Sequence, residues 1–579
     1  MAILFILQAS LDYPMDMPFL GLGALVFLMN LLLILAPLVA WSFLIDARAL
    51  SILSIFSSAG FAALNLRKIT ERGAPIELLD FYNLQVSPVL LKYMGVREIL
   101  GLVAILCLPF GFRYAVNRYW SKRRPWGVPH FAYISISFLL VIYFTAICAE
   151  PFRDDSFLLD QFPPHPDHAD ASRRNGLPLA TILNLKFIRV FHPNNYNEEV
   201  IRKIVSIKPQ VAPASMPNNN VVLILLESFR DYSLDGVPFH DDVLPFYHQL
   251  KKESVVGNYY SPVLGGGTAN VEFEVLTGMS MAFLPADSIP HEQYINQPTP
   301  AVVGWLAKFG YDTYSIHDNF GSYYNRVNVF KTLRFKQFFA SKELTSEFGR
   351  FKGPGYPDRT VFEKSIRLFS ASPEKPQFQY LITMNTHGPY SGTKSEKSWV
   401  SPGTYEDPTI ADELNVYADR MHRLDGDLKW YFEQLKKLKN PPTVIMFGDH
   451  HPSMSVRMPF PDEGSRHKVE VVMWNNKTGL VAPQKSQIMP CVSSMILHSA
   501  GVPLTPYFEF IQNMCATHDF HAPLALTGKN AQEFASYEIL CYDRLFGEKF
   551  STPNSLEKKG AKGEALLSSP PKDAPASGN

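Results

Sequence analysis

The hydrophobic pattern separates an apolar first quarter of the chain from a mixed remainder. Residues 19–44 and Phe131–Ala149 are runs without a charged side chain, and each is long enough to cross a bilayer as a helix. Two shorter apolar runs, interrupted by glycine or proline, follow the first. We therefore expect a transmembrane domain at 1–150 with about four helices, at 19–44, 49–66, 98–116 and 131–150.

The connection between the third and fourth apolar runs is strongly basic. It contains, with no acidic residue among them, Arg113, Arg118, Lys122, Arg123 and Arg124. Short loops with such an excess of basic residues stay in the cytoplasm, so the chain should leave the fourth run on the outer face. This pattern predicts a multi-pass protein of the plasma (inner) membrane whose larger part lies on the extracytoplasmic, or periplasmic, side.

After residue 150 the pattern changes twice. Residues 151–219 are polar and are expected to form a linker, with an amphipathic helix around Leu179–Phe191. From residue 220 to 546, short β-rich runs alternate with helical segments, which is typical of an α/β domain with a mostly parallel sheet. The predicted strands are Val221–Leu226, Tyr311–Ile316, Gln379–Met384, Thr443–Phe447 and Val469–Trp474, and Asp412–Leu438 is a predicted helix. Residues 547–579 lack the apolar content for a core and are expected to be a disordered tail.

Charge and cysteine content narrow the classes of function. The 54 basic and 54 acidic residues cancel, so nothing attracts the chain as a whole to nucleic acid, and we expect no nucleic-acid partner. The five cysteines are Cys107, Cys148, Cys491, Cys515 and Cys541. The first two lie in apolar runs, and the other three allow one disulfide at most, which excludes a disulfide-stabilised scaffold.

Four predicted strands end in side chains that bind metals or protons. Glu227 follows the first strand, His317 follows Tyr311–Ile316, His387 comes shortly after the third strand, and Asp449-His450-His451 follows Thr443–Phe447. Ligands collect at the carboxyl ends of the strands in open α/β sheets, so we expect these side chains to meet. One such ending is explained by helix capping, but four of them indicate a site.

A glycine-rich stretch, Gly265-Gly266-Gly267-Thr268, precedes a predicted helix. Thr268 should lie near the N-cap or in the first turn, where unpaired N–H groups and the helix dipole favour anions. Taken alone, this stretch also fits a threonine N-cap without any chemistry. The strand endings described above favour the chemical interpretation.

Glu227, Asp449 and His450 offer two carboxylates and one imidazole. This donor set suits Mn²⁺, Mg²⁺ or Zn²⁺ rather than metals that prefer thiolates. The Thr268 hydroxyl is a candidate fourth ligand, because coordination makes its alkoxide accessible near neutral pH. The expected reaction is attack on a phosphoryl or sulfuryl centre, with a covalent intermediate on Thr268. His451 is not assigned to the metal.

These motifs resemble the lipoteichoic acid synthase and phosphoglycerol transferase family of the sulfatase and alkaline phosphatase superfamily. The resemblance rests on Leu226-Glu227-Ser228-Phe229, the Thr268 loop with Glu272-Phe273, His387, and Gly448-Asp449-His450. It implies an alkaline-phosphatase-like (sulfatase) domain with Mn²⁺ as cofactor. By the family pattern the metal ligands are Glu227, Thr268, Asp449 and His450, and the nucleophile is Thr268.

The resemblance extends to the family's glycerol-phosphate pocket. That pocket has a histidine, then an aromatic residue followed by Asn-Arg, and this chain carries His317 and Tyr324-Asn325-Arg326 at the same spacing. Tyr324 stands where many members have tryptophan, and the added hydroxyl is compatible with a different head group. Arg326 is expected to pair with phosphate oxygens. His387 is expected to bind the substrate or to protonate the leaving oxygen.

The resemblance implies a membrane-anchored transferase that moves glycerol phosphate from phosphatidylglycerol and releases diacylglycerol. The acceptor is left open among a glycerol-phosphate chain, a glycolipid and a periplasmic glucan. A phosphoethanolamine transferase is a rival, although it would favour acidic or aromatic groups over the His317 and Arg326 pair and often has paired cysteines. A hydrolase using water as acceptor, and a lipid sensor without catalysis, are further alternatives; a true sulfatase would carry cysteine or serine at position 268.

Overall fold

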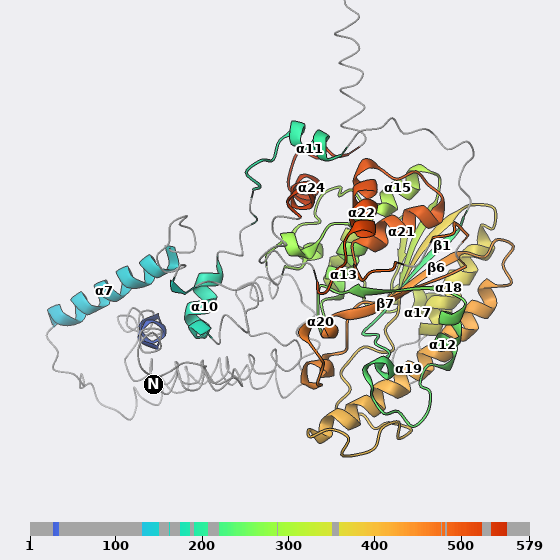
Figure 1. Ribbon diagram of the computed structural model, residues 1–579, viewed down its shortest axis with the longest axis horizontal. Coiled ribbons are helices and arrows are strands. Elements are labelled where there is room, and N and C mark those ends of the chain that lie inside the picture. Colours follow the sequence, from blue (N-terminus) through green and yellow to red (C-terminus); the bar gives the residue numbers. More distant parts are fainter. Residues whose placement is uncertain are drawn as a thin grey trace, which may run out of the picture. The chain divides into compact units, whose positions relative to one another are not determined.

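The computed structural model describes residues 27–33, 130–149, 161–162, 174–185, 190, 192–205, 219–285, 288–349, 358–475, 477–480, 483–523 and 534–552. These residues fall into two compact units (Figure 1). One comprises Met1–Val190 with Pro285–Ser288, and the other comprises Phe191–Leu284 with Ile289–Asn579.

In the first unit, the described residues form helices. Residues 27–33 are helical, as are α7 (His130–Ala149) and α10 (Leu177–Leu183). Asn30 joins two of these segments, because its side chain donates to Asn175 O (2.8 Å) and accepts from Leu179 N (2.9 Å). The fourth predicted transmembrane run coincides with α7.

The other predicted transmembrane runs fall largely outside the described part of the chain. The runs at 49–66 and 98–116 lie wholly outside it, and only residues 27–33 of the first run lie inside. A search of the described residues found no helix that combines the length and the apolar character needed to cross a membrane.

The second unit is built on one eight-stranded sheet with the order β4-β3-β5-β1-β6-β7-β2-β8. Its strands are β1 (Val221–Leu226), β2 (Val255–Tyr260), β3 (Asp312–His317), β4 (Gln337–Phe339), β5 (Gln377–Ile382), β6 (Thr443–Gly448), β7 (Lys468–Trp474) and β8 (Gln487–Ile488). Only the pairings of β7 with β6 and β2 are antiparallel among those described. The predicted α/β domain with a mostly parallel sheet is therefore confirmed.

Strand β1 lies at the centre of the sheet because its sequence is apolar at every position. Val221, Leu223 and Leu225 point into one hydrophobic core, and Val222, Ile224 and Leu226 into the other. All six side chains are buried. A continuous apolar run is what a parallel strand covered on both faces requires, since neither face meets water.

Helices cover both faces of the sheet (Figure 1). Contributing to one core are α13 (Thr268–Thr277), α15 (Val302–Lys308), α16 (Arg326–Thr332), α21 (Cys491–Ala500), α22 (Pro506–Thr517) and α24 (Ala535–Leu545). Contributing to the other are α12 (Pro245–Lys252), α17 (Ser341–Phe348), α18 (Asp358–Ala371) and α19 (Pro408–Leu435). Short segments complete the unit: α11 (Glu198–Ile204), α14 (Pro290–Gln293), α20 (Glu463–Arg466), and the 3₁₀ turns Tyr232–Asp235, Met281–Phe283, Tyr323–Asn325 and Ser453–Arg457.

One strand ends earlier than the sequence predicts. Strand β5 ends at Ile382, two residues before the predicted end at Met384. The buried carboxylate of Asp358 accepts hydrogen bonds from Met384 N (2.6 Å) and Asn385 N (3.1 Å). These donors are thereby taken out of the sheet ladder, and the chain turns away toward His387.

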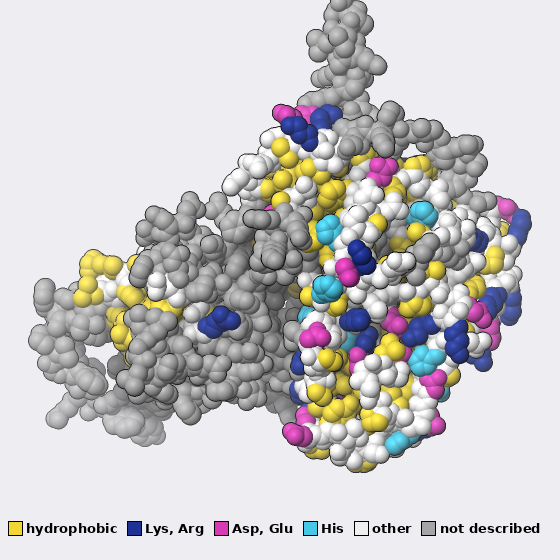
Figure 2. Space-filling model, in the orientation of Figure 1, with side chains coloured by type: hydrophobic (Ala, Val, Ile, Leu, Met, Phe, Trp, Pro, Cys, Tyr) yellow, Lys and Arg dark blue, Asp and Glu magenta, His cyan; other side chains and the backbone are white. Residues whose placement is uncertain are grey.

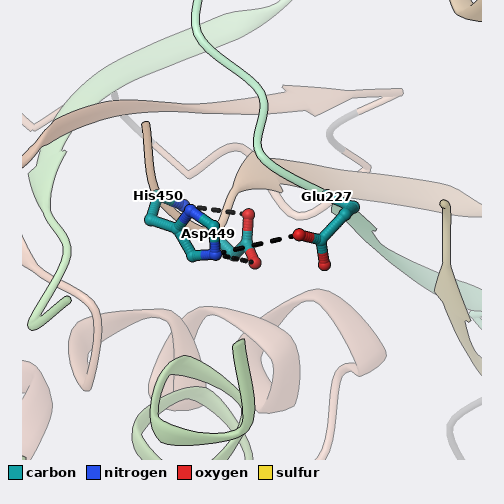
Figure 3. Close-up of side chains that lie close together, drawn as sticks. All are labelled: Glu227, Asp449 and His450. Carbon is teal, nitrogen blue, oxygen red and sulfur yellow. Dashed lines mark hydrogen bonds and ion pairs between the residues drawn. The ribbon is translucent and has the colours of Figure 1, made fainter. Parts of the chain in front are cut away.

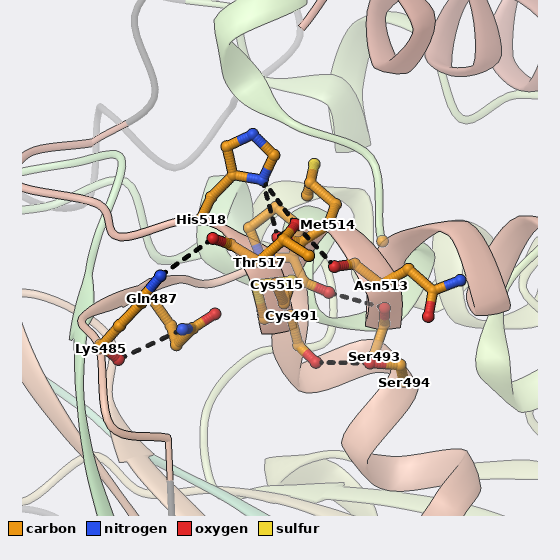
Figure 4. The surroundings of a disulfide bond; sticks show 12 residues. Lys485, Gln487, Cys491, Ser493, Ser494, Asn513, Met514, Cys515, Thr517 and His518 are labelled. Carbon is orange, nitrogen blue, oxygen red and sulfur yellow. Dashed lines mark hydrogen bonds between the residues drawn. A yellow bond between two sulfur atoms is a disulfide. The ribbon is translucent and has the colours of Figure 1, made fainter. Parts of the chain in front are cut away.

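A disulfide joins two of the C-terminal helices, and a buried carboxylate binds the third to the chain that follows it. A disulfide joins Cys491 on α21 to Cys515 on α22 (Figure 4). Asp543 on α24 accepts from Phe550 N and Ser551 N, each at 2.8 Å. Phe550 and Ser551, which lie in the predicted tail at 547–579, are thus bonded to α24, and residues 553–579 lie outside the described part of the chain.

Gly448, the last residue of β6, provides a test of the packing beneath the site. A Cβ atom there would lie 2.2 Å from the main-chain oxygen of Phe229, which cannot move as a side chain can. We expect Gly448→Ala to lower the free energy of unfolding by about 1–3 kcal/mol. Gly426→Ala in α19 is the matched control, because a Cβ there meets nothing within 4 Å. The control should be more stable by about 0.5–1 kcal/mol. Equal denaturant midpoints for the two variants would contradict this account.

Candidate active site

Two neighbouring strands bring the acidic residues of the site together. Strands β1 and β6 run parallel with Leu226 opposite Gly448, so Glu227 and Asp449 follow at the same edge of the sheet. The turn after β1 is fixed by Ser228 N, which donates to Asp449 Oδ1 (2.7 Å). One ligand atom each from Glu227, Asp449 and His450 lies within 4.8 Å of the others, and all three residues are buried (Figure 3).

The hydrogen-bond acceptor atoms of these three side chains lie close to one another. His450 Nδ1 lies 2.8 Å from the carbonyl oxygen of His451, which can only accept, so Nδ1 carries the proton. In the neutral ring the lone pair is then on Nε2, which lies 3.2 Å from Asp449 Oδ2 and 3.8 Å from Glu227 Oε1. Asp449 Oδ2 is buried and accepts no hydrogen bond from the described residues. A cation between the three groups satisfies them all, so the residues fit a divalent metal.

The electrostatics of the pair of carboxyl groups support this conclusion. Burial, and then the neighbouring charge of Glu227, hold the pKa of Asp449 well above its usual range. Burial would raise the pKa of Glu227 too, but the nearby imidazoles of His387 and His450 and the hydrogen bonds from Ser228 and Thr268 outweigh it, and this pKa is lowered. Two buried carboxylates side by side repel each other, and a bound divalent cation would reverse that effect.

Thr268 joins the same group as the first residue of α13. The preceding glycines make this possible, because Gly265 and Gly267 adopt φ values of +68° and +87° that side chains disfavour. Thr268 Oγ1 donates to Glu227 Oε2 (3.0 Å) and is buried. The other oxygen of Glu227 accepts from Ser228 Oγ (2.9 Å). The hydroxyl therefore lies at the helix N-terminus and beside the metal-ligand set.

His387 approaches this group from the loop after β5. Its Nδ1 donates to Gly388 O (2.6 Å), which leaves Nε2 for other partners. Arg420 on α19 anchors the loop, since Nη1 donates to His387 O and Nη2 to Pro389 O (3.0 Å). Thr386, the residue before His387, donates from Oγ1 to Glu227 O, which holds the loop beside Glu227.

His317 is a neutral acceptor at the end of β3. Its Nδ1 donates to Ile382 O (3.1 Å), and burial together with the charge of Arg326 holds its pKa well below the usual range. The other ring nitrogen, Nε2, is buried and has no hydrogen-bond partner among the described residues. Such an atom is available to a hydroxyl group of a ligand.

Arg326 has a partner that the sequence analysis did not assign. It is buried, and its Nε and Nη2 donate to Glu272 Oε1 at 3.0 and 2.8 Å. Its guanidinium carbon also lies 5.2 Å from the ring centre of Tyr324. Glu272 follows Thr268 by one helical turn, and that spacing is the signal that could have identified it.

His451, which was not assigned to the metal, acts through its backbone and its ring. Its side chain is buried, and Nε2 donates to Lys468 O (2.9 Å). Its carbonyl oxygen accepts from His450 Nδ1 (2.8 Å) and from Gly265 N (3.2 Å). One oxygen atom thus joins the metal-ligand histidine to the loop that carries Thr268.

Comparisons with known proteins agree with this geometry. Residues 219–495 match the family model described as Sulfatase. The putative cyclic beta-1,2-glucan modification protein of Rhizobium meliloti (strain 1021) is 29% identical over 419 residues, which cover 67% of this chain and 64% of that protein. Lipoteichoic acid synthase 2 of Bacillus subtilis (strain 168) is 24% identical over 241 residues, covering 40% of this chain and 35% of that protein. The chain thus spans less than two thirds of the length of either relative.

A solved structure has a similar fold. It is the Streptococcus pyogenes phosphoglycerol transferase GacH in complex with sn-glycerol-1-phosphate, with a TM-score of 0.52 and 21% sequence identity. The similarity covers 64% of this chain and 98% of that chain. The second unit therefore has the alkaline-phosphatase-like α/β fold that the sequence predicted.

The metal-ligand set predicts how the protein responds to manganese. We expect the metal-stripped full-length protein to bind Mn²⁺, measured by the loss of the free-ion electron paramagnetic resonance signal. Asp449→Asn should weaken binding roughly a hundredfold or more, because it removes a charged ligand and leaves the buried set incomplete. Asp427→Asn is the matched control, since that carboxylate pairs with Arg359 at the surface (2.9 Å). Equal affinity in the two variants would show that Asp449 does not bind the ion.

Proposed function

We propose that this chain is a metal-dependent phosphoglycerol transferase, and its similarity to the Sulfatase family model, to a lipoteichoic acid synthase and to the phosphoglycerol transferase GacH supports the proposal. It would move glycerol phosphate from phosphatidylglycerol to an acceptor outside the cytoplasm through a Thr268 intermediate. The observation that carries the proposal is the hydrogen bond from Thr268 Oγ1 to Glu227 Oε2 (3.0 Å), within reach of three metal-ligating side chains. A merely structural N-cap has no need of that environment.

The first half-reaction forms a bond from Thr268 Oγ to phosphorus and breaks the bond from phosphorus to the diacylglycerol oxygen. The Thr268 proton passes to Glu227, which already accepts it in a hydrogen bond. His387, in its protonated form, gives the Nε2 proton to the leaving oxygen, so diacylglycerol departs as a neutral alcohol. Its orientation is set by the Nδ1 contact with Gly388 O.

The second half-reaction reverses these roles. A hydroxyl of the acceptor attacks phosphorus and gives its proton to His387, while Thr268 leaves and regains its proton from Glu227. A divalent cation, with Mn²⁺ the first choice and Mg²⁺ or Zn²⁺ as alternatives, would be held by Glu227, Thr268, Asp449 and His450. When bound, it offsets the negative charge that develops on the transferred group.

The glycerol phosphate head group has three candidate partners beside this centre. His317 Nε2 is a buried acceptor, suited to a glycerol hydroxyl. Arg326 uses Nε and Nη2 for Glu272, and its remaining nitrogen, Nη1, is suited to a phosphate oxygen. Tyr324 contributes an aromatic wall over Arg326.

The domain organisation we propose follows the sequence pattern. Residues 1–150 would anchor the chain in the plasma (inner) membrane by about four helices, 151–219 would be a linker, 220–546 the extracytoplasmic catalytic domain and 547–579 the tail. The disulfide Cys491–Cys515 supports an extracytoplasmic domain, because such bonds persist in oxidising compartments. A membrane anchor suits a lipid donor, whose tails stay in the bilayer while the head group enters the site.

For the acceptor we favour a periplasmic glucan over a glycerol-phosphate chain or a glycolipid. The relative from Rhizobium meliloti, named for cyclic beta-1,2-glucan modification, aligns over 419 residues. The lipoteichoic acid synthase of Bacillus subtilis aligns over 241 residues. The greater extent of the first similarity is the reason for this choice.

A phosphoethanolamine transferase remains the second candidate, and one feature supports it. The disulfide Cys491–Cys515 is the kind of paired cysteine that those enzymes often carry. An ammonium head group would need a free acidic partner, however, and Glu272 is already bound to Arg326. The cluster around Arg326 therefore favours a head group without a positive charge.

The nucleophile can be identified by intact-mass analysis of the full-length protein in detergent with Mn²⁺ and phosphatidylglycerol. We expect a mass increase of one glycerol phosphate, which is lost in Thr268→Ala together with roughly a thousandfold or more of the turnover. Thr268→Ser keeps a hydroxyl and is expected to retain the adduct. An adduct that persists in Thr268→Ala would exclude this residue as the nucleophile.

The identities of the donor and of the acceptor can be tested in one further assay. Phosphatidylglycerol should yield diacylglycerol, and addition of cyclic beta-1,2-glucan should raise the rate by giving the intermediate an acceptor. Phosphatidylethanolamine should be a poor donor, because its head group lacks the glycerol hydroxyls and Glu272 is already paired with Arg326. Preferential release of diacylglycerol from phosphatidylethanolamine would instead establish the second candidate. Stimulation by a glycerol-phosphate polymer but not by the glucan would contradict the proposed acceptor.

A further inference from the structure

A buried ion pair joins the helix of the nucleophile to the loop of the substrate pocket. The Glu272 side chain has no solvent exposure and that of Arg326 has 4%. Nε and Nη2 of the arginine donate to the same carboxylate oxygen at 3.0 and 2.8 Å. Planar guanidinium groups lose orientational freedom in such a contact, so Glu272 fixes the plane of Arg326.

The position of Glu272 gives this pair a geometric consequence. Thr268 is the first residue of α13, and Glu272 lies four residues later, so both project from the same side of the helix. Every side chain of α13 is buried, so the helix has little freedom to shift. A guanidinium fixed to Glu272 is therefore also fixed relative to the Thr268 hydroxyl.

The loop that carries Arg326 needs such an anchor. Tyr324 and Asn325 both adopt left-handed backbone conformations, with φ of 49° and 54°. A residue of this kind is strained and persists only where the surroundings hold it. Arg326 begins α16 directly after them, so its bond to Glu272 holds the strained turn from the C-terminal side.

His291, which lies beside this ion pair, does not compete with Arg326 for the charge of Glu272. His291 on α14 is fully buried, with Nδ1 3.6 Å from Glu272 Oε2. Burial and the charge of Arg326 lower the pKa of His291 to about 3, so its ring is neutral at physiological pH. The carboxylate therefore has Arg326 as its cationic partner, and neither ring nitrogen of His291 forms a hydrogen bond within the described chain.

We propose that Glu272 is a positioning residue for phosphoryl transfer, holding Arg326 at a fixed distance from the Thr268 nucleophile. This inference rests on the proposed function, because it assigns the Arg326 guanidinium to the phosphate of the donor. Glu272 itself does not touch the substrate. It occupies Nε and Nη2, which leaves Nη1 for the phosphate, and neutralises the arginine so that the free site does not carry a buried unpaired charge.

The test uses the full-length protein and the variants Glu272→Gln, Arg326→Met and their combination. Each single variant leaves a buried group without its partner, so both should unfold at a lower temperature than the wild type. The double variant removes both charges and should regain most of the lost thermal stability. Arg359→Gln with Asp427→Asn, a partly exposed pair, is the control and should change neither stability nor turnover appreciably.

Turnover should behave differently from stability. Glu272→Gln should lower the turnover number about a hundredfold with phosphatidylglycerol, because the arginine is no longer aligned. Within the Arg326→Met background, the same substitution should have no further effect on turnover. The double variant should therefore have nearly the thermal stability of the wild type but a low turnover number. Recovery of turnover together with stability would overturn the proposal, since the pair would then serve folding alone. Independent, multiplicative losses would overturn it too, because Glu272 would not act through Arg326.

A second substrate separates this inference from the proposed function. Bis(p-nitrophenyl) phosphate offers a phosphodiester without a glycerol head group or lipid tails. If the wild type cleaves it but does not use phosphatidylglycerol, the assigned donor is wrong, and the same set of variants still tests Glu272. The non-additive loss described above would then support the positioning role, and full activity of Glu272→Gln on this substrate would overturn it.

Discussion

The structure depends on one electrostatic constraint, the burial of several hydrogen-bond acceptors at a single point. Two carboxyl groups, Glu227 and Asp449, and the Nε2 atom of His450 converge at the edge of the sheet, where they repel each other unless a cation lies between them. The surrounding chain supplies some hydrogen-bond donors to the two carboxyl groups, among them Ser228 N, Ser228 Oγ and Thr268 Oγ1. Asp449 Oδ2 still lacks a donor from any described residue. This arrangement of acceptors fits a divalent metal, and the strands that lead into it are apolar along the whole of β1 and from Val444 to Phe447 in β6.

Much of the fold could be predicted from the sequence. The apolar run of β1 indicates a parallel strand, because a strand that is buried on both faces needs apolar side chains at every position. The strand endings at Glu227, His317 and Asp449 indicate the edge of the sheet at which ligands collect. The end of β5 could not be predicted, because it depends on the Asp358 carboxylate, which comes from a helix distant in sequence. Strand β2, which the sequence analysis does not predict, and the antiparallel direction of β7 likewise depend on tertiary pairing, which no local pattern encodes.

The structure brings several of the predicted site residues together through contacts that the sequence did not predict. The structure brings Thr268 into contact with Glu227 and places both beside Asp449 and His450. The sequence predicts that Arg326 faces a phosphate, but two of its three nitrogen atoms donate to Glu272. A sequence shows that a glutamate lies one turn beyond a nucleophile, but only the packed structure shows which charge it meets. The backbone contacts of His451 are invisible in a sequence for the same reason, since every residue has a carbonyl group.

That carbonyl group has a thermodynamic consequence. A single oxygen atom of His451 accepts from both His450 Nδ1 and Gly265 N. If His450 binds an ion, ordering of the glycine loop and binding of that ion are therefore linked equilibria. Linkage is reciprocal, so an ordered loop raises the affinity for the ion by the same factor by which the bound ion favours the ordered loop. An enzyme whose Thr268 is occupied by a donor would then release its metal more slowly than the free enzyme. In an environment where metals are scarce, the presence of substrate would itself preserve the pool of active molecules.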